Sequence, residues 1–326
     1  MKILVTGGAG YIGSITVAEL VREGHAVTVF DNLSNGHRKA VVQGANLIVG
    51  ELADSNRLAE TFAKGEFDAV MHFAAFIEAG ESMNAPERFF RNNTANTLTL
   101  IETMLRAGVQ RFVFSSTAAL YGSPETVPIS EDAPLHPTNA YGESKLLVEH
   151  MLAWMNRIHG LRYASLRYFN AAGATAELGE AHNPESHLIP LVLQAAVGKR
   201  SNISIFGTDY PTPDGTCVRD YIHVADLARA HLLALHALER REKLIYNLGN
   251  GNGFSVRQVI DAARRVTGQP IPVVECPRRA GDPAVLVASS GKIQSELGWQ
   301  PQFPNPEEII RSAWEWHRRH PDGYGN

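Results

Sequence analysis

The sequence predicts an α/β fold in which a doubly wound parallel sheet is followed by a smaller α/β domain. Three observations support this prediction. Short apolar runs alternate with amphipathic stretches along the first half of the chain, a glycine-rich turn joins the first pair, and the composition changes after residue 170. Strands that alternate with helices form a parallel sheet covered on both faces. Ligands bind such sheets at the carboxyl ends of the strands, so a site is expected there.

The first strand, helix and second strand are the most clearly marked elements. Residues 3–6 predict a short buried strand, and residues 26–30 predict a second strand with Asp31 at its carboxyl end. Between them a helix is expected over residues 11–23, where apolar side chains recur at helical spacing, and Gly24 is its expected cap. The alternation continues with expected strands at residues 68–73, 110–115 and 162–167 and expected helices at residues 96–107 and 140–159.

The chain divides into two predicted domains, residues 1–170 and residues 171–326, of which the second is a smaller lid. Residues 171–185 are rich in Ala, Gly, Glu and Asn and are expected to form a loop. A helix is expected over residues 221–236, and the chain is predicted to return to the first domain around residues 219–250.

Composition excludes several classes of function. The 326 residues have 44% hydrophobic and 20% charged side chains and a net charge of −4, an ordinary globular balance. Such a chain has no overall attraction for nucleic acid or membranes, and no stretch reaches the ~18 apolar residues of a membrane span. Cys217 and Cys276 match neither a metal-ligand spacing nor a disulfide framework, so no metal site is predicted. Reduced thiols and a cytoplasmic location are expected.

The glycine-rich turn predicts a dinucleotide site. Gly7, Gly10 and Gly13 would let backbone N–H groups approach a pyrophosphate at the positive end of the helix. Asp31 follows Gly13 by 18 residues (31 − 13), close to the ~20 expected for a carboxylate that binds the adenosine ribose hydroxyls. A carboxylate there repels a 2′-phosphate. The first domain is therefore predicted to be a Rossmann-type domain that prefers NAD to NADP, the alternative for Asp31 being a turn residue.

A second motif predicts acid–base chemistry. Tyr141 and Lys145 are four residues apart, so they share one face of the expected helix. An ammonium and a cationic nicotinamide ring would lower the phenol pKa from ~10 toward neutrality, which lets Tyr141 take a hydroxyl proton as a hydride leaves. Thr117 follows the expected strand 110–115, and its hydroxyl could hold the reacting oxygen. Each has an ordinary alternative: a core aromatic beside an exposed lysine, and a hydroxyl-rich turn.

With these motifs the chain resembles the extended short-chain dehydrogenase/reductase family, and within it the sugar-nucleotide epimerases, over essentially its whole length. The glycine turn and the Tyr–Lys pair mark the wide family. The epimerase branch is marked by IFGTDYPTPDGTCVRDYIHV at residues 205–224 and by RRAGDPA at residues 278–284. Further matching segments are DNLSNG, HFAA, SSTAALYG, LRYFNAAGA, HLIP and YNLG, at residues 31–36, 72–75, 115–122, 166–174, 187–190 and 246–249.

The resemblance implies a role for each site residue. Tyr141 is the base, Lys145 positions the nicotinamide ribose and tunes Tyr141, and Thr117 supplies the assisting hydroxyl. NAD is implied as the cofactor, held by Gly7, Gly10, Tyr11, Ile12, Gly13, Asp31, Asn32, Ser34, Asn35, Gly36, Glu51, Leu52, Phe73, Ala74, Ala75, Asn92, Tyr141, Lys145, Tyr168 and Phe169. A UDP-sugar is implied as the substrate, held by Thr117, Tyr141, Asn170, His187, Leu188, Ser204, Phe206, Arg219, Tyr221, Arg279 and Asp282.

The activity that the resemblance implies is the interconversion of UDP-galactose and UDP-glucose in galactose metabolism, by a homodimer. A hydride would pass from the sugar C4 to tightly bound NAD, the 4-keto sugar would rotate, and the hydride would return. Thr117 is followed by two alanines, which cannot supply the acid and base of a 4,6-dehydratase. The alternatives are a 4-epimerase for UDP-N-acetylglucosamine, UDP-glucuronate or a UDP-pentose, and a non-catalytic nucleotide-sensing protein.

Five positions depart from the commonest pattern of the family. Glu51 replaces an aspartate near the adenine, Ile77 replaces a lysine of some members, Thr117 replaces a serine, and His187 replaces an asparagine beside the sugar. Leu286 stands at a position where family members of narrow sugar specificity have a tyrosine, and members that accept N-acetyl sugars have a cysteine or a serine. This position leaves the acceptance of N-acetylated sugars open.

Overall fold

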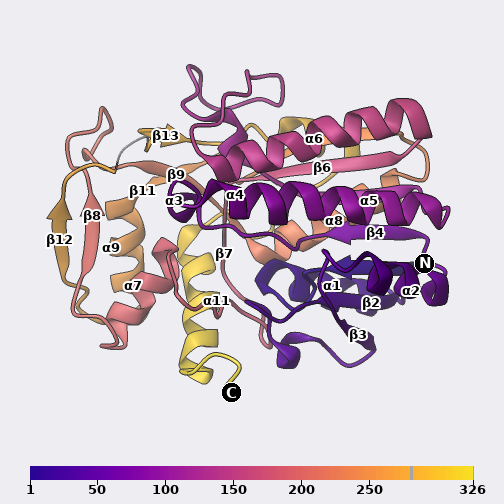
Figure 1. The fold of residues 1–326 in the computed structure, drawn as a ribbon. Coiled ribbons are helices and arrows are strands. Elements are labelled where there is room, and N and C mark those ends of the chain that lie inside the picture. The colour runs from indigo at the N-terminus through magenta and orange to yellow at the C-terminus, as the bar shows by residue number, and fades with distance from the viewer. Residues whose placement is uncertain (280–281, 326) are drawn as a thin grey trace.

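The computed structural model describes residues 1–279 and 282–325, so residues 280 and 281 of the RRAGDPA motif lie outside it. Its main layer is a seven-stranded parallel sheet in the order β10-β6-β5-β4-β1-β2-β3 (Figure 1). From β1 the chain builds outward to both sides, which makes the sheet doubly wound and confirms the predicted fold class. The strands are β1 (Lys2–Thr6), β2 (Ala26–Asp31), β3 (Ala45–Val49), β4 (Ala69–His72), β5 (Arg111–Thr117), β6 (Arg162–Tyr168) and β10 (Lys243–Leu248).

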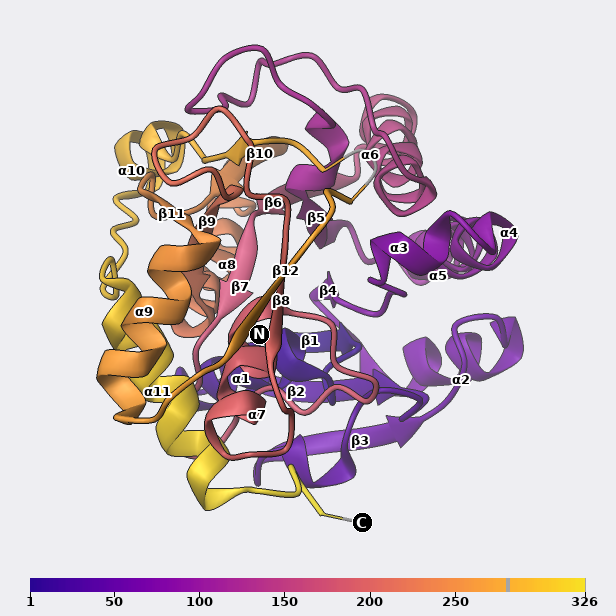
Figure 2. The same cartoon turned by 90° about the vertical axis from the view of Figure 1, so that its left-hand side faces the viewer.

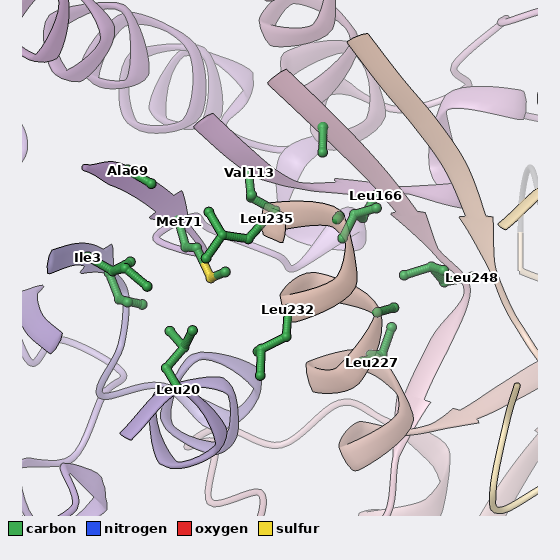
Figure 3. Packing of buried hydrophobic residues seen from close by; sticks show 14 of the residues in the cluster. Ile3, Leu20, Ala69, Met71, Val113, Leu166, Leu227, Leu232, Leu235 and Leu248 are labelled. Atoms are coloured by element: carbon green, nitrogen blue, oxygen red, sulfur yellow. The ribbon is translucent and has the colours of Figure 1, made fainter. Parts of the chain in front are cut away.

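Helices cover both faces of this sheet, because successive strand residues point to opposite sides. In β1, Ile3 packs with Leu20 and Leu232 on one face, whereas Leu4 packs with Leu100 on the other. Figure 3 shows Ile3, Leu20 and Leu232 facing one another in the first of these cores. The first face carries α1 (Tyr11–Arg22) and α8 (Val224–Ala237), and the second carries α2 (Ser55–Gly65), α5 (Asn96–Arg106) and α6 (Ala140–His159).

The expected helix over residues 140–159 has the bounds that α6 shows, and local signals explain both of its ends. Asn139 is the N-cap, and its side chain accepts a hydrogen bond from the Gly142 N–H at 2.8 Å. Gly160 closes the helix at φ 68°, a conformation that glycine adopts without strain. No helix of the described residues is both long and apolar enough to cross a membrane.

The second half of the chain builds smaller sheets at one end of the main sheet, on the left in Figure 1, and Figure 2 views the molecule from that end. Strand β9 pairs with β7, β11 and β13, and β8 pairs with β12. A separate apolar core joins these strands to three helices through residues such as Ile205, Ile260 and Ile310. The elements are β7 (Asn170–Ala172), α7 (Leu188–Ala196), β8 (Ile203–Phe206), β9 (Val218–His223), β11 (Gly253–Ser255), α9 (Val256–Thr267), β12 (Val273–Cys276), β13 (Val285–Leu286), α10 (Gly291–Leu297) and α11 (Pro306–Arg319).

Two sequence expectations were wrong in part. The helix expected over residues 221–236 begins only at Val224, because residues 221–223 end β9 and pair with β7. His223 then caps the helix by accepting a hydrogen bond from the Ala225 N–H at 3.1 Å. Residues 171 and 172, expected as loop, belong to β7 for the same reason. After α8 the chain adds β10 beside β6 in the main sheet, while the domain division at residue 170 stays a prediction.

Candidate functional site

A cavity of about 310 Å³ lies where the sheet order reverses, at the carboxyl ends of β1, β2, β4, β5 and β6. Its wall contains all twenty residues that the resemblance assigns to NAD. Thr117, Asn170 and His187 of the expected substrate set also line it, as does Ile77. The structure therefore brings the expected cofactor and catalytic residues to one cavity, although they come from segments spread over the first half of the chain.

The glycine turn is packed too closely for side chains. Gly7 has φ 72°, and a Cβ there would lie 2.4 Å from the Ala74 nitrogen. A Cβ on Gly13 would lie 2.2 Å from the Gly7 carbonyl oxygen. Gly10 is the N-cap of α1, and no side chain caps its N–H groups. A backbone cradle at a helix N-terminus fits a pyrophosphate, because the unpaired N–H groups and the helix dipole both favour negative charge.

Asp31 is held in place by the backbone around it. Its carboxylate accepts hydrogen bonds from the Ala9 N–H at 3.0 Å and from the Leu33 N–H at 2.8 Å. Burial raises the pKa of Asp31, and these two hydrogen bonds oppose that rise. Glu51, the departure from the family pattern, lies beside Asn32, whose side-chain amide donates to it at 3.1 Å. Both carboxylates therefore line the end of the cavity at which the adenosine is expected.

Lys145 is 2% exposed and lies inside the fold rather than on a solvated helix face. Its Nζ donates a hydrogen bond to the Ser115 carbonyl oxygen at 2.9 Å and lies 4.9 Å from the centre of the Phe114 ring. Burial lowers the pKa of Lys145 to about 7. The ordinary reading of the Tyr–Lys pair, an aromatic core residue beside an exposed lysine, does not describe this side chain.

Tyr141 lies one turn earlier on α6, and its backbone N–H donates to the Ser82 hydroxyl at 3.0 Å. Burial raises the pKa of Tyr141, and a hydrogen bond with the Thr117 hydroxyl lowers it in part. The expected shift of this pKa toward neutrality rests on the Lys145 ammonium together with the cationic nicotinamide ring, so it stays a prediction.

The other expected substrate residues lie outside this cavity, on the smaller sheets and in the segments beside them. Arg219 of β9 forms an ion pair with Asp282, and the guanidinium of Arg279 lies 4.0 Å from the centre of the Phe206 ring. Ser204 lies with Phe206 on β8, while Tyr221 is buried on β9 and Leu188 begins α7. The two arginines that were expected to hold a diphosphate thus have partners within the chain.

The sequence reasoning missed several residues of the cavity wall, of which Glu180 and His182 are the titratable ones. Glu180 and His182 line the cavity, in the segment that was expected to be a loop. Glu180 is 5% exposed and accepts hydrogen bonds from the imidazole Nδ1 atoms of His182 at 2.9 Å and His187 at 2.8 Å. The available signal was the alternation of two glutamates and two histidines over residues 180–187.

Comparison with known proteins agrees with this geometry. The model of the NAD dependent epimerase/dehydratase family matches residues 3–249. A UDP-glucose 4-epimerase of Streptomyces lividans is 55% identical over 324 residues, which cover 99% of this chain and 98% of that protein.

Two solved structures are also similar. The UDP-glucose 4-epimerase from Brucella ovis in complex with NAD has a TM-score of 0.93 and 46% identity, covering 96% of this chain and 97% of that one. The UDP-glucose 4-epimerase from Bifidobacterium longum in complex with NAD+ and UDP has a TM-score of 0.95 and 36% identity, covering 99% of this chain and 100% of that one.

Proposed function

The chain belongs to the NAD dependent epimerase/dehydratase family, and from this we propose that it is an NAD-dependent isomerase that interconverts UDP-galactose and UDP-glucose. Relatives with this activity in their names match over nearly the full length of the chain. The observation that carries the proposal is the shared cavity, in which Tyr141, Lys145 and Thr117 lie together with the whole set of residues expected to hold NAD.

The residues of the cavity fit NAD. The space around Gly7 and Gly13, which a Cβ would fill, is the close approach that a pyrophosphate requires. The buried carboxylate of Asp31 would accept hydrogen bonds from ribose hydroxyls and would repel a 2′-phosphate. Held by these residues, NAD would supply the acceptor and then the donor of the hydride at the sugar C4.

The protein residues would handle the proton. The Tyr141 phenolate takes the proton of the sugar 4-hydroxyl, while the Thr117 hydroxyl, which is hydrogen-bonded to Tyr141, holds the reacting oxygen. The cavity must also stabilise the phenolate, whose charge burial disfavours. The Lys145 ammonium and the positive charge of the cofactor ring would do this together.

The UDP group would be held by Arg219, Arg279 and Asp282. Two guanidiniums suit a diphosphate because each can donate two parallel hydrogen bonds to phosphate oxygens. The Arg219–Asp282 ion pair would open on binding, so that Arg219 turns to phosphate and Asp282 becomes free for ribose hydroxyls. Leu286 packs near Ala118 and Tyr121 at the end of β5. A medium-sized residue there keeps an epimerase for N-acetylated UDP-sugars as the second candidate.

The first experiment is a turnover assay. The purified protein is incubated with UDP-galactose without added NAD, and UDP-glucose is followed by chromatography. Product formed by the wild type and lost in Tyr141→Phe supports a 4-epimerase that retains its own cofactor. Turnover only of N-acetylated or acidic UDP-sugars would point to the second candidate. Stoichiometric NAD without turnover of any UDP-sugar would favour a non-catalytic nucleotide-sensing protein.

We also propose a cytoplasmic homodimer that acts in galactose metabolism. Large apolar side chains are exposed on α6, where Trp154 is 60% and Ile158 is 63% exposed. They lie four residues apart, so they share one helix face. The Arg157 guanidinium lies 5.4 Å from the centre of the Trp154 ring. Burial of such a stripe against a second copy would remove this apolar surface from water.

A further inference from the structure

His187 is held by two carboxylates at the same ring nitrogen. Its Nδ1 lies 2.8 Å from a carboxylate oxygen of Glu180 and 2.9 Å from a carboxylate oxygen of Glu185. The Glu185 oxygen also accepts the backbone N–H groups of Ser186 and His187, both at 2.7 Å. This arrangement places a proton on Nδ1, because neither carboxylate could approach a bare nitrogen lone pair.

Burial makes the charge of this cluster matter. The side chains of Glu180 and Glu185 are each 5% exposed. Two carboxylates removed from water need a positive partner, since an unpaired buried charge is costly. Burial by itself would lower the pKa of His187, but the hydrogen bonds and charges of Glu180 and Glu185 outweigh it and raise the pKa to about 10. The charged form of the imidazole is therefore the stable one at neutral pH.

Protonation decides what the other ring nitrogen can do. With Nδ1–H bound to the carboxylates, a neutral ring would leave Nε2 as an acceptor, whereas an imidazolium makes Nε2–H a donor. Among the residues that the structure describes, Nε2 makes no hydrogen bond. His187 lines the cavity and its side chain is 38% exposed. The donor is thus available to a ligand.

The surroundings favour an anionic ligand at this point. His187 is the N-cap of α7, a nine-residue helix, and no side chain caps the first N–H groups. The other titratable groups that face Glu180 and Glu185 are His182, Tyr11 and His317. Burial lowers the pKa of His317 and raises that of Tyr11, so neither supplies charge at neutral pH.

A bound metal ion is the competing explanation, because Glu180, His182, Glu185 and His187 place four ligand atoms close together. The spacing favours the proton. Ligand atoms at ~2.0–2.2 Å from a tetrahedral ion lie about 3.4 Å apart, whereas Nδ1 lies 2.8 and 2.9 Å from the two carboxylate oxygens. These are hydrogen-bond distances.

We propose that Glu180 and Glu185 are positioning residues that hold His187 as an imidazolium, so that its Nε2–H donates to a phosphate oxygen of the sugar nucleotide. This inference rests on the proposed function. His187 then touches the substrate, and the two glutamates act through it. The sequence expectation placed His187 at the substrate but assigned no role to either glutamate.

The test compares the wild-type holoenzyme with Glu180→Gln/Glu185→Gln, which removes both charges and keeps the shape. Glu177→Gln, an exposed change in the same segment, is the matched control. Nitrogen NMR of ¹⁵N-histidine-labelled protein, with His187→Asn to assign the signal, reports the charge of His187 without any turnover. Calorimetry with UDP gives the dissociation constant, and assays with UDP-galactose give KM and kcat separately. Bound NAD confirms folding, and Glu185→Gln alone is the second variant if the double one does not fold.

We expect both nitrogens of His187 to stay protonated to about pH 9 in the wild type, and to titrate near the ordinary ~6.5 in the double variant. At pH 8 the variant should bind UDP about 10-fold more weakly and show a KM raised to match, with kcat within about twofold, as the loss of one charge-assisted hydrogen bond implies. At pH 5.5 the difference should vanish, because the ring is then protonated in both. In His187→Asn the ratio of its UDP affinity to that of the wild type should stay constant between pH 5.5 and 8, because no imidazole titrates at this position in either protein.

Three results would overturn the proposal. The first is a neutral His187 in the wild type at pH 7.5. The second is equal affinity of the wild type and the double variant for UDP at pH 8. The third is one equivalent of bound metal in the wild type that the double variant loses. Absence of turnover in the wild type would instead count against the proposed function, because the NMR and UDP-binding measurements do not depend on catalysis.

Discussion

The Nζ of Lys145 donates a hydrogen bond to the main-chain carbonyl oxygen of Ser115, 2.9 Å away and 30 residues earlier in the chain. This contact ties the first turns of α6 to the carboxyl end of β5, the strand that ends in Thr117. It also places the lysine charge next to the cavity that Tyr141 lines.

Replacement of Tyr141 by phenylalanine should abolish proton transfer and leave the cofactor in place. Removal of a general base costs ~10²–10⁴-fold in rate, so turnover of UDP-galactose should fall by at least that factor. The phenyl ring keeps nearly the size of the side chain that lines the cavity, so bound NAD, measured after denaturation, should stay at the wild-type level. Near-normal turnover would remove Tyr141 as the base.

Replacement of Lys145 by methionine should change the pH dependence of turnover. Burial raises the pKa of Tyr141, so without a neighbouring cation the phenolate forms only at alkaline pH. We expect kcat at pH 7 to fall by ~10²-fold or more and to recover as the pH rises toward 10. The check is a pH–rate profile from 6 to 10 for both proteins. Profiles of the same shape would show that Lys145 does not tune Tyr141.

Replacement of Asp31 by asparagine should weaken NAD binding and relax cofactor choice. The variant loses a charged acceptor. A hydrogen bond to a charged group is stronger than one to a neutral group, and this difference should lower the affinity for NAD about 10- to 100-fold. The asparagine amide would also turn its NH₂ group toward either the Ala9 N–H or the Leu33 N–H, both of which now donate to carboxylate oxygens of Asp31. Binding of NAD and NADP to the emptied protein measures both effects. Unchanged preference for NAD would contradict the assigned role.

Replacement of Gly13 by alanine should destabilise the glycine turn. The new Cβ would lie 2.2 Å from the Gly7 carbonyl oxygen, so the backbone must move, at a cost of about 1–3 kcal/mol. We expect a lower midpoint of thermal unfolding and a reduced NAD content. Gly291→Ala is the matched control, since nothing lies within 4 Å of a Cβ there. Equal effects of the two changes would show that the close packing is unimportant.

Charges on the exposed face of α6 should disrupt the proposed dimer. Trp154→Glu/Ile158→Glu places two like charges on a stripe that is more than half exposed in the single chain. Light scattering should give a dimer for the wild type and a monomer for the variant. Val274→Glu, which changes a 46% exposed residue on β12, should remain dimeric. A monomeric wild type would contradict the proposed assembly directly.

Local sequence patterns were sufficient for five of the seven strands of the main sheet, whereas β3, β10 and helix α2 were not predicted. Residues 140–159 were expected as a helix and are α6, because the Asn139 cap and the Gly160 terminus are properties of neighbouring residues. The four-residue step from Tyr141 to Lys145 is local in the same sense. It predicted that both side chains face one way, and both line the cavity.

What lay beyond the sequence depends on contacts between distant segments. Residues 221–223 come directly before a helix but form the end of β9, because β7 pairs with them. The pKa of Lys145 is lowered to about 7 because the fold buries it, and Arg219 meets Asp282, 63 residues later, only in the folded chain. The sequence by itself determined most strands of the main sheet, the helices over residues 11–23, 96–107 and 140–159, and the residue types of the site, since these follow from periodicity and backbone chemistry. Only the tertiary structure decided burial, and with it the charge states of Lys145 and His187, because desolvation depends on everything that packs around a group.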